Sequence, residues 1–290
     1  TKELIREVLQ KKFKVLATSG NLNNHIGVPL TLLQLKEQHQ IGIIEMGANQ
    51  LNEIRNLCEI ALPNWGYITN FGKAHLEGFG SEAGVIQGKS ELYKYLQQHQ
   101  GQILINGDDP KQLEQTKNHR VIQFGQGKGS DFKIEYLPND GNHLELKFRE
   151  FFFKSPLYGS YNFSNLAAAV SFGALFEVPL KDIQKAIAKY DSENNRSQKL
   201  SIHGTPIILD AYNANPSSME VALRAFAKNQ TENNTVILGD MLELGKQSEK
   251  EHEEMLSLCL ALGFHQIYTL GERFKKATVA HPSKGCFTDI

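Results

Sequence analysis

The chain has 290 residues, of which 40% are apolar and 22% charged, and its 31 basic and 32 acidic side chains leave a formal net charge of −1. This composition is typical of a folded globular protein, and it excludes both a disordered chain and the basic excess of a nucleic-acid-binding surface. At about 100–200 residues per domain, the length corresponds to two domains.

The three cysteines are far apart in the sequence and form no C-x-x-C pair, which indicates reduced thiols, as in a cytoplasmic protein. No apolar run approaches the roughly 18–20 residues of a membrane span, and the opening TKELIREVLQKK is amphipathic rather than a signal peptide. We therefore expect a cytoplasmic protein that binds neither membranes nor nucleic acid. We further expect a monomer, although no residue pattern indicates the oligomeric state. Because the helical pattern begins with the first residues, we also expect the chain to be cut from a longer one.

The first part of the chain alternates helical and strand-like segments. A helix over about 2–12 precedes a strand at 13–17, and the Gly- and Asn-rich loop TSGNLNNHIG follows. Further strands are expected at 41–46, 67–69 and 103–105. Between them we expect a helix at 51–60 and another that Ser81 caps and that runs through Lys89 to Leu96. This alternation predicts a mostly parallel central sheet with helices on both faces.

Residues 131–153 interrupt this alternation. Short runs of alternating apolar and polar residues on either side of the turn signal PNDG predict an antiparallel β excursion. Helical patterns return over 161–176 and 180–190, and the polar run DSENNRSQ is the expected linker, with the domain boundary near Asn194. A second α/β series follows, with strands at 207–210, 236–238 and 266–270 and helices at 217–228 and 249–262. We therefore predict a first domain over 1–194 and a second, Rossmann-like α/β domain over 195–290.

Polar residues follow several of the expected strands, and ligands of open α/β sheets bind beyond the carboxyl ends of strands. Glu45 ends IGIIE, and Asn70 and His75 lie in NFGKAHLEGFGS. Asp210 ends PIILD, and Asp240 ends TVILGD. We expect these residues to form one polar face that is divided between the two domains.

Each of these residues also has a structural interpretation. Asp or Asn after a strand is often a turn former or a helix cap, His75 alone is more often a structural hydrogen-bonder, and a helical lysine such as Lys89 is usually solvated. The case for Glu45 is stronger, because a carboxylate is costly to bury without a charged partner. Neither GKAHLEGFG nor GQGKG matches the phosphate-loop pattern GxxxxGK[ST]. The residues alone predict a polar cleft for a cation and a nucleotide, and they leave the reaction open.

Four segments that occur in the order NLNNHIGVPLTLL, EMGAN, NFGKAHLEGFGS and DAYNANPSSM resemble the Mur ligase family. The resemblance extends from the first residue to at least LGDMLELG, and the ordered series is far more specific than any single motif. The segment DAYNANP favours the branch that adds D-alanyl-D-alanine to UDP-N-acetylmuramoyl-tripeptide, because the tripeptide-forming branch has a His-containing motif there.

The resemblance implies an ATP-dependent ligase of bacterial peptidoglycan precursor synthesis. Enzymes of this family phosphorylate a substrate carboxylate with ATP, and an amine then attacks the acyl-phosphate to give an amide, ADP and phosphate. The logic is that a carboxylate oxygen is a poor leaving group and phosphate is a good one. Mg²⁺ neutralises charge on the transferring phosphoryl group. The implied cofactors are ATP and Mg²⁺, and the implied partners are UDP-N-acetylmuramoyl-tripeptide and D-alanyl-D-alanine.

The resemblance also implies roles for particular residues. Glu45 and His75 match the positions that hold the second Mg²⁺. Lys89, in GVIQGKSELY, matches a lysine that is carbamylated and so becomes an oxygen donor near the metal. Asn70 opens the N-x-G-x-A-H segment and is expected to contact the substrate or the metal's surroundings. The ATP site is implied to consist of Asn162 and Asn165 near the adenine, Arg196 near the phosphates, Asp210 near the ribose, and Tyr212, Asn213 and Asn215 beside it.

The chain departs from the family pattern at several positions. Tyr161 stands where His is usual, Asn195 stands where Gly commonly precedes the arginine, and QLN at 50–52 replaces His-Pro-Gly. The family's phosphate loop ends in Gly-Lys-Thr and runs directly into Thr-Lys-Glu, with which this chain begins. We therefore expect the sequence as given to lack that loop and the UDP-binding domain, and to turn over poorly.

Two alternatives remain. The first is a folylpolyglutamate-type or cyanophycin-type ligase of the same superfamily, against which NLNNHIGVPLTLL and DAYNANP argue. The second is a non-catalytic metabolite-binding module that keeps the fold, against which the presence of Glu45, His75 and Lys89 argues.

Overall fold

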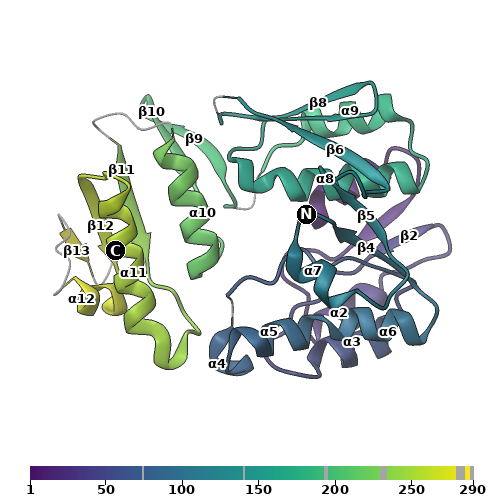
Figure 1. Ribbon diagram of the computed structural model, residues 1–290, viewed down its shortest axis with the longest axis horizontal. Coiled ribbons are helices and arrows are strands. Elements are labelled where there is room, and N and C mark those ends of the chain that lie inside the picture. Colours follow the sequence, from purple (N-terminus) through teal and green to yellow (C-terminus); the bar gives the residue numbers. More distant parts are fainter. Residues whose placement is uncertain (74, 140, 193–194, 229–233, 279–284, 288–290) are drawn as a thin grey trace.

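The computed structural model describes residues 1–73, 75–139, 141–192, 195–228, 234–278 and 285–287. Two α/β regions lie side by side, a larger one that ends with α9 and a smaller one that begins with β9 (Figure 1). Within the described residues, no helix is long and apolar enough to cross a bilayer.

The larger region holds most of the helices and the longest sheet. Its helical elements are α1 (Lys2–Leu9), α2 (Gly27–Leu32), α3 (Glu53–Ala61), α4 (Leu76–Phe79), α5 (Glu82–Lys89), α6 (Glu91–Gln98), α7 (Pro110–Gln115), η1 (Ser160–Asn162), α8 (Phe163–Leu175) and α9 (Leu180–Lys189). Its strands are β1 (Val15–Ala17), β2 (Ile41–Ile43), β3 (Trp65–Gly66), β4 (Gln102–Asn106), β5 (Ile122–Gly125), β6 (Phe132–Leu137), β7 (Leu144–Phe148) and β8 (Phe151–Ser155).

Six strands of the described chain form one sheet in the order β3-β4-β5-β6-β7-β8. The strands from β3 to β6 are parallel, whereas β6, β7 and β8 form an antiparallel meander. β1 and β2 form a separate parallel pair. The predicted parallel sheet with an antiparallel excursion is therefore confirmed.

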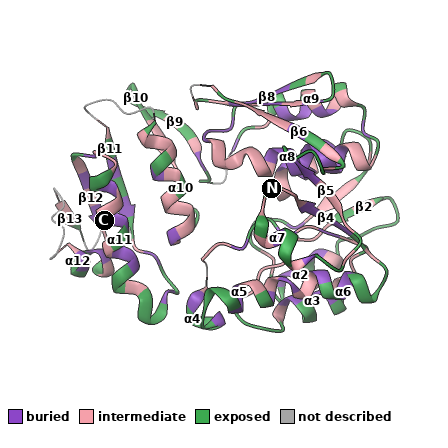
Figure 2. Ribbon diagram, viewed as in Figure 1, coloured by how far each residue is buried: buried purple, intermediate pink, exposed green. Residues whose placement is uncertain are grey.

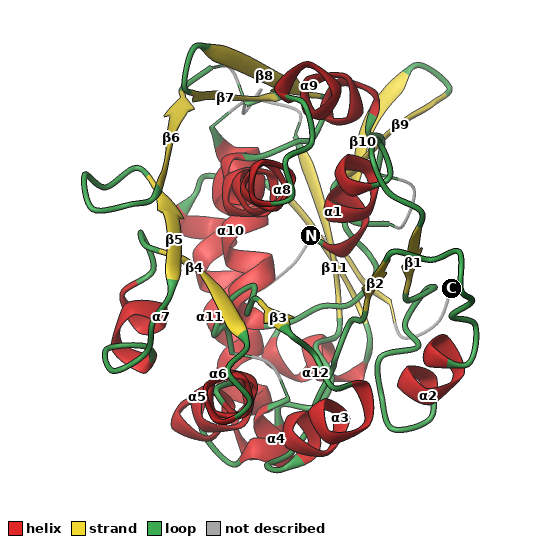
Figure 3. Cartoon of the chain, turned by 90° about the vertical axis from the view of Figure 1, so that its right-hand side faces the viewer, coloured by secondary structure: helices red, strands yellow, loops and turns green. Residues whose placement is uncertain are grey.

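Helices cover both faces of this sheet because the side chains of a strand alternate between its faces. In β4, Leu104 belongs to a large core cluster with residues of α1, α8 and α9. Its neighbours Ile103 and Ile105 belong to another cluster, with Tyr93 and Leu96 of α6. The view in Figure 3 shows α1, α8 and α9 on one side and α3, α5 and α6 on the other.

α8 is the central helix of the larger region. Its residues 166–173 are all buried, and the helix is almost entirely coloured as buried or intermediate in Figure 2. A helix that is apolar around most of its circumference, as FSNLAAAVSFGAL is, can only be stable in a protein interior. α8 is therefore held in the core from Leu166 onward, directly after the polar residues at its start.

The smaller region is a second α/β unit. Its elements are β9 (Gln198–Ile202), β10 (Thr205–Leu209), α10 (Pro216–Ala227), β11 (Thr235–Gly239), η2 (Gly245–Gln247), α11 (Ser248–Ala261), β12 (Gln266–Leu270), α12 (Glu272–Ala277) and β13 (Gly285–Phe287). β11, β12 and β13 form a parallel sheet in that order, and β9 and β10 form an antiparallel hairpin.

Some predicted elements differ from the structure. The strand expected at 67–69 is instead β3, because the backbone pairing with β4 involves Trp65 and Gly66. The helix expected to run through Lys89 to Leu96 is two helices, which meet at Ser90. β9 was not predicted. The boundary near Asn194 lies outside the described residues, as does Asp140 of the PNDG turn.

The two regions share an apolar cluster. Leu76 and Phe79 of α4 and Val85 of α5 are 5%, 7% and 0% exposed. They pack in the same cluster as residues of the smaller region, which include Leu223, Val236, Leu238, Met241, Leu244, Met255, Leu256 and Phe264. α4 is therefore a helix of the larger region whose apolar side is part of the core of the smaller one.

Candidate functional site

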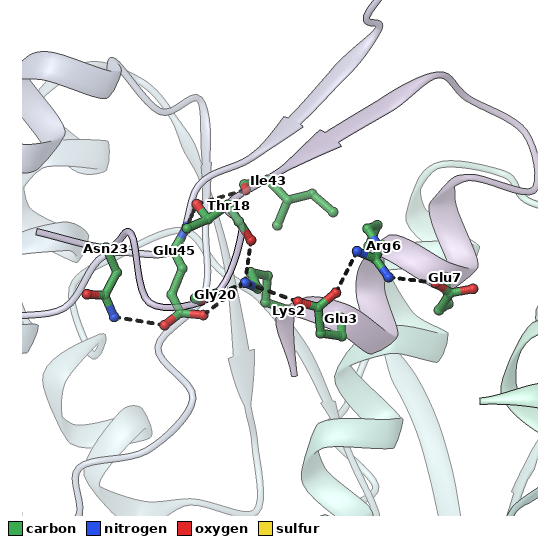
Figure 4. A network of polar contacts seen from close by, with 9 residues as sticks. All are labelled: Lys2, Glu3, Arg6, Glu7, Thr18, Gly20, Asn23, Ile43 and Glu45. Carbon is green, nitrogen blue, oxygen red and sulfur yellow. Dashed lines mark hydrogen bonds and ion pairs between the residues drawn. The ribbon is translucent and has the colours of Figure 1, made fainter. Parts of the chain in front are cut away.

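Glu45 lies just beyond β2 in a network of polar contacts (Figure 4). Its backbone N–H donates to Thr18 Oγ1 at 2.9 Å, and its Oε1 accepts a hydrogen bond from Asn23 Nδ2 at 2.9 Å. Its Oε2 lies 3.7 Å from Lys2 Nζ, and the side chain is 27% exposed. The carboxylate thus has a cationic neighbour, while Oε2 is beyond hydrogen-bond distance of that cation.

Lys2 joins the start of the chain to this network. Its ammonium group donates to the carbonyl oxygens of Thr18 and Gly20, and it pairs with Glu3 at 3.1 Å. The side chain is only 10% exposed. Three acceptors besides Glu45 therefore hold this cation, which makes it a fixed positive charge at the end of β1.

Gly47 explains how Asn23 reaches Glu45. The N–H of Gly47 donates to the carbonyl oxygen of Asn23 at 2.8 Å, and a Cβ on Gly47 would lie 2.9 Å from Asn23 Nδ2. A side chain at this position would therefore press on the amide of Asn23 in the position that it has in the structure. Sequence analysis did not single out Asn23, Lys2 or Thr18, although Asn23 lies within the NLNNHIG segment on which the family resemblance rests.

The structure brings Asn70 and Lys89 together. Lys89, at the end of α5, donates from Nζ to the carbonyl oxygen of Asn70 at 2.8 Å, and Asn70 Oδ1 accepts from the N–H of Gly72 at 3.0 Å. Burial lowers the pKa of Lys89 to about 8. A larger fraction of this amine is therefore neutral near physiological pH than is usual for lysine.

His75 precedes α4 with a left-handed backbone, φ = 54°. Its Nδ1 contacts Oε2 of Glu243, which belongs to the smaller region. Among the described residues, no hydrogen bond reaches its Nε2. The segment that carries Asn70 and His75 also contacts the smaller region through Lys73, whose Nζ lies 3.1 Å from Oε1 of the buried Glu251.

The loop after Glu45 packs against α4. A Cβ on Gly78, in α4, would lie only 2.1 Å from the backbone oxygen of Asn49 in the EMGAN segment. Glycine therefore permits the close approach of the two segments. Glu45 and His75 therefore come from segments that pack against each other, and no direct contact joins their side chains among the described residues.

A second group of candidate residues surrounds Ser197. Tyr161 Oη and Ser197 Oγ are 2.6 Å apart, and Asn162 Nδ2 lies 3.4 Å from the same Oγ. Asn165 Nδ2 donates to Asn162 Oδ1 at 2.9 Å. Burial raises the pKa of Asp210, although a hydrogen bond from the backbone of Ser197 opposes that rise. The structure therefore connects the start of α8 to the end of β10.

Arg196 and Tyr212 extend this group. The guanidinium carbon of Arg196 lies 4.0 Å from the centroid of the Tyr212 ring, a cation–π contact. Asn213 is exposed. Asn215 is the N-cap of α10, since its Oδ1 accepts from the N–H of Ser218 at 3.0 Å in a capping box. Asn215 therefore has a structural role as a helix cap.

Asp240 likewise has a structural role. Its carboxylate accepts hydrogen bonds from the backbone N–H groups of Arg273, at 3.0 Å, and Phe274, at 2.9 Å, in the first turn of α12. An acceptor at a helix N-terminus satisfies donors that the helix itself leaves unpaired.

Thr1 lies between the two groups of candidate residues. Its hydroxyl donates to Oδ1 of Asn165, and the next residue, Lys2, belongs to the Glu45 network. The Glu45 network and the Ser197 group therefore face the same part of the molecule.

The donors near Glu45 and His75 can be compared with what Mg²⁺ requires. Among the described residues, no three His, Cys, Asp or Glu side chains gather as a metal site. Glu45 Oε2 and His75 Nε2 nevertheless lack a hydrogen-bond partner there, and a carbamate on Lys89 would add oxygen donors, which Mg²⁺ prefers. In donor type these residues fit a divalent cation.

Two family models match the chain. The Mur ligase middle domain matches residues 1–173, and the Mur ligase, glutamate ligase domain matches residues 195–284. A similar curated protein is the UDP-N-acetylmuramoyl-tripeptide–D-alanyl-D-alanine ligase of Bacillus subtilis, 32% identical over 94% of this chain and 60% of that protein. The enzyme of that name from Haemophilus influenzae is 35% identical over 88% of this chain and 57% of its own length. The chain thus spans less than two thirds of these relatives.

Solved structures agree with these matches. Crystal structure I of MurF from Acinetobacter baumannii superposes with a TM-score of 0.86 at 32% identity, covering 99% of this chain and 64% of that one. MurF ligase from Thermotoga maritima in complex with ADP superposes with a TM-score of 0.83 at 25% identity, covering 100% of this chain and 67% of that one. With both family models matched in order, the chain belongs to the Mur ligase family.

Proposed function

We propose that this chain is the catalytic core of an ATP-dependent ligase that adds D-alanyl-D-alanine to UDP-N-acetylmuramoyl-tripeptide. The observation that carries the choice of substrate is the similarity to relatives of that name, at 30% identity or more over most of the chain. The fold supports the proposal, because two solved MurF structures superpose over nearly the whole of this chain.

The Ser197 group is proposed to bind ATP. Asn162 and Asn165 at the start of α8 supply amide groups for the adenine, and Arg196 supplies a cation for the phosphates. Asp210 and Tyr212 belong to the same group and are proposed to lie beside the ribose. Asn213 is proposed to line the same cleft. Asn215 acts there through the cap of α10, which sets the course of the segment before it.

The other side of the site is proposed to hold Mg²⁺ through Glu45, His75 and the carbamate of Lys89. The cation supplies neutralisation of phosphoryl charge when it is bound. The protein's own residues fix the ligand positions: Asn23 orients the carboxylate of Glu45, and the carbonyl oxygen of Asn70 orients Lys89. Burial keeps part of Lys89 neutral, and only a neutral amine can add CO₂.

The reaction proposed for this site proceeds through an acyl-phosphate. The terminal phosphoryl group of ATP is transferred to the substrate carboxylate, which releases ADP. The amine of D-alanyl-D-alanine then attacks the acyl carbon, and phosphate leaves with the electron pair of the broken C–O bond. The protein contributes positioning and charge stabilisation, which supply most of the catalysis in phosphoryl transfer.

The division into domains is part of the proposal. Two observations support a first domain over 1–194 and a second over 195–290. Helices α1, α8 and α9 of the first share one apolar core, and the second has its own parallel sheet, β11-β12-β13. The site then lies between the domains, because Glu45 and Lys89 belong to the first and Arg196 and Asp210 to the second.

Phosphate release from ATP by the full-length protein tests the proposal. Release should require both UDP-N-acetylmuramoyl-tripeptide and D-alanyl-D-alanine, and Glu45→Ala should abolish it. Glu59→Ala is the matched control, since Glu59 is an exposed glutamate on α3 that pairs with Arg55 of the same helix. Release with glutamate in place of the dipeptide would favour a folylpolyglutamate-type ligase, and no release from the folded protein would favour a binding module.

A further inference from the structure

We infer that Glu243, in the smaller region, is a positioning residue for His75, and that it orients the imidazole so that Nε2 faces the metal ion. This inference rests on the proposed function. It adds that the metal site of the first domain depends on one carboxylate of the second domain.

The contact between the two side chains determines which ring nitrogen is free. Oε2 of Glu243 lies against Nδ1 of His75, and an ionised carboxylate can only accept hydrogen bonds. Nδ1 therefore carries the proton, and in the neutral ring Nε2 keeps its lone pair. Metal-binding histidines commonly donate their other N–H to a carboxylate in this way, which sets the tautomer and the ring orientation.

The backbone around Glu243 is anchored near His75. The carbonyl oxygen of Glu243 accepts from the N–H of Glu77 at 3.1 Å, two residues after His75. Met241, two residues before Glu243, and Leu244, directly after it, are 0% and 2% exposed and belong to the apolar cluster that α4 shares, whereas Leu242 between them is exposed. Glu243 is thus fixed on both sides, although its own side chain is 51% exposed.

An ordinary surface ion pair would lack these features. The exposed pair of Glu220 with Arg224, for example, joins residues four positions apart on one helix. The contact between His75 and Glu243 joins residues 168 positions apart, at the place where the two regions share a core. The sequence segment LGDMLELG thereby has a function that its pattern alone does not indicate.

Metal affinity provides a test that does not depend on turnover. Mn²⁺ replaces Mg²⁺ as the probe, and its binding to the full-length protein without nucleotide is followed by electron paramagnetic resonance. Glu243→Ala should weaken Mn²⁺ binding about 10–100-fold, as is usual when a carboxylate behind a ligand is removed. Glu243→Asp should restore part of the loss. Glu220→Ala is the matched control and should bind Mn²⁺ as the wild type does.

The histidine tautomer is the second readout. In protein with ¹⁵N-labelled histidine, two-bond ¹H–¹⁵N correlations should show His75 with its proton on Nδ1. In Glu243→Ala that proton should move to Nε2. A merely structural role for Glu243 would alter stability and leave the tautomer unchanged.

The outcomes separate this inference from the proposed function. If the wild type binds Mn²⁺ no better than Glu45→Ala, the proposed metal site is wrong. If the wild type binds Mn²⁺ well and Glu243→Ala binds it equally well, or if the tautomer does not change, the role of Glu243 is wrong and the metal site stands. Weaker binding together with a changed tautomer supports the inference.

Discussion

Replacement of Gly78 by alanine tests the packing that brings the Glu45 and His75 segments together. A Cβ at this position would lie 2.1 Å from the backbone oxygen of Asn49, and no side-chain rotation can move that atom. The two segments must separate by about 1 Å to reach the 3.0 Å below which real Cβ atoms essentially never approach other heavy atoms. Overpacking of this kind costs about 1–3 kcal/mol, and the upper end applies to a backbone collision.

Helix propensity acts in the opposite direction. Alanine is favoured over glycine inside a helix by at most about 1 kcal/mol, so propensity alone predicts that Gly78→Ala stabilises α4. With the collision included, we expect a net loss of roughly 1–2 kcal/mol, which lowers the melting temperature by roughly 2–8 °C for domains of this size. The sign of the change therefore decides between the two effects.

Differential scanning calorimetry of the full-length protein measures this change. The matched control is Gly129→Ala, because a Cβ there meets no atom within 4 Å and the backbone needs no left-handed conformation. The control should be neutral or slightly stabilising. A Gly78→Ala protein as stable as the wild type would refute the packing argument. Weaker Mn²⁺ binding should accompany the loss of stability, because the candidate ligands Glu45 and His75 belong to the two segments that would be displaced.

Three further predictions concern single side chains. In ¹³C-bicarbonate, the ¹³C NMR signal of a carbamate should appear in the wild type and be absent in Lys89→Arg. The signal should grow between pH 7 and pH 8.5, because burial lowers the pKa of Lys89 to about 8. A signal that persists in the variant would disprove the assignment. Arg196→Lys should weaken ADP binding about tenfold in calorimetric titration, because lysine loses the ring contact with Tyr212 and the paired donors for phosphate. The control Arg224→Lys should bind ADP as the wild type does. Equal ADP affinity of the two variants would contradict this prediction. Burial lowers the pKa of His252 below 6.5, so that just below pH 6.5 this histidine is protonated in the unfolded chain and neutral in the folded one. The free energy of unfolding should therefore fall by up to about 1.4 kcal/mol per pH unit as the pH drops below 6.5. Urea midpoints at pH 7.5 and 5.5 should differ less in His252→Gln, and an unchanged difference would exclude His252 as the source.

Much of the fold was predictable because the pattern that determines it is local. The alternation of apolar strands with helices predicted the parallel sheet, and Ile103, Leu104 and Ile105 show the two-sided burial on which that prediction depends. The hairpin strand β9 was missed because its QKLSI sequence is half polar and none of its residues is fully buried. β3 was displaced because backbone pairing, rather than side-chain pattern, determines where a strand begins.

The candidate site was predictable only at the ends of strands. Glu45 and Asp210 follow strands and could be identified from their position, and Asn70 and Lys89 do lie together. The partners of these residues could not be identified, because Lys2, Asn23 and Glu243 approach them from segments that are distant in the sequence. Such contacts depend on how elements pack, which a single sequence does not record.

The position of α4 limits how the two regions can move relative to each other. Separating them would expose Leu76 and Phe79 to water, and each buried side chain of this size is worth about 1.5–3 kcal/mol. The helix therefore joins the two regions next to the contact between His75 and Glu243.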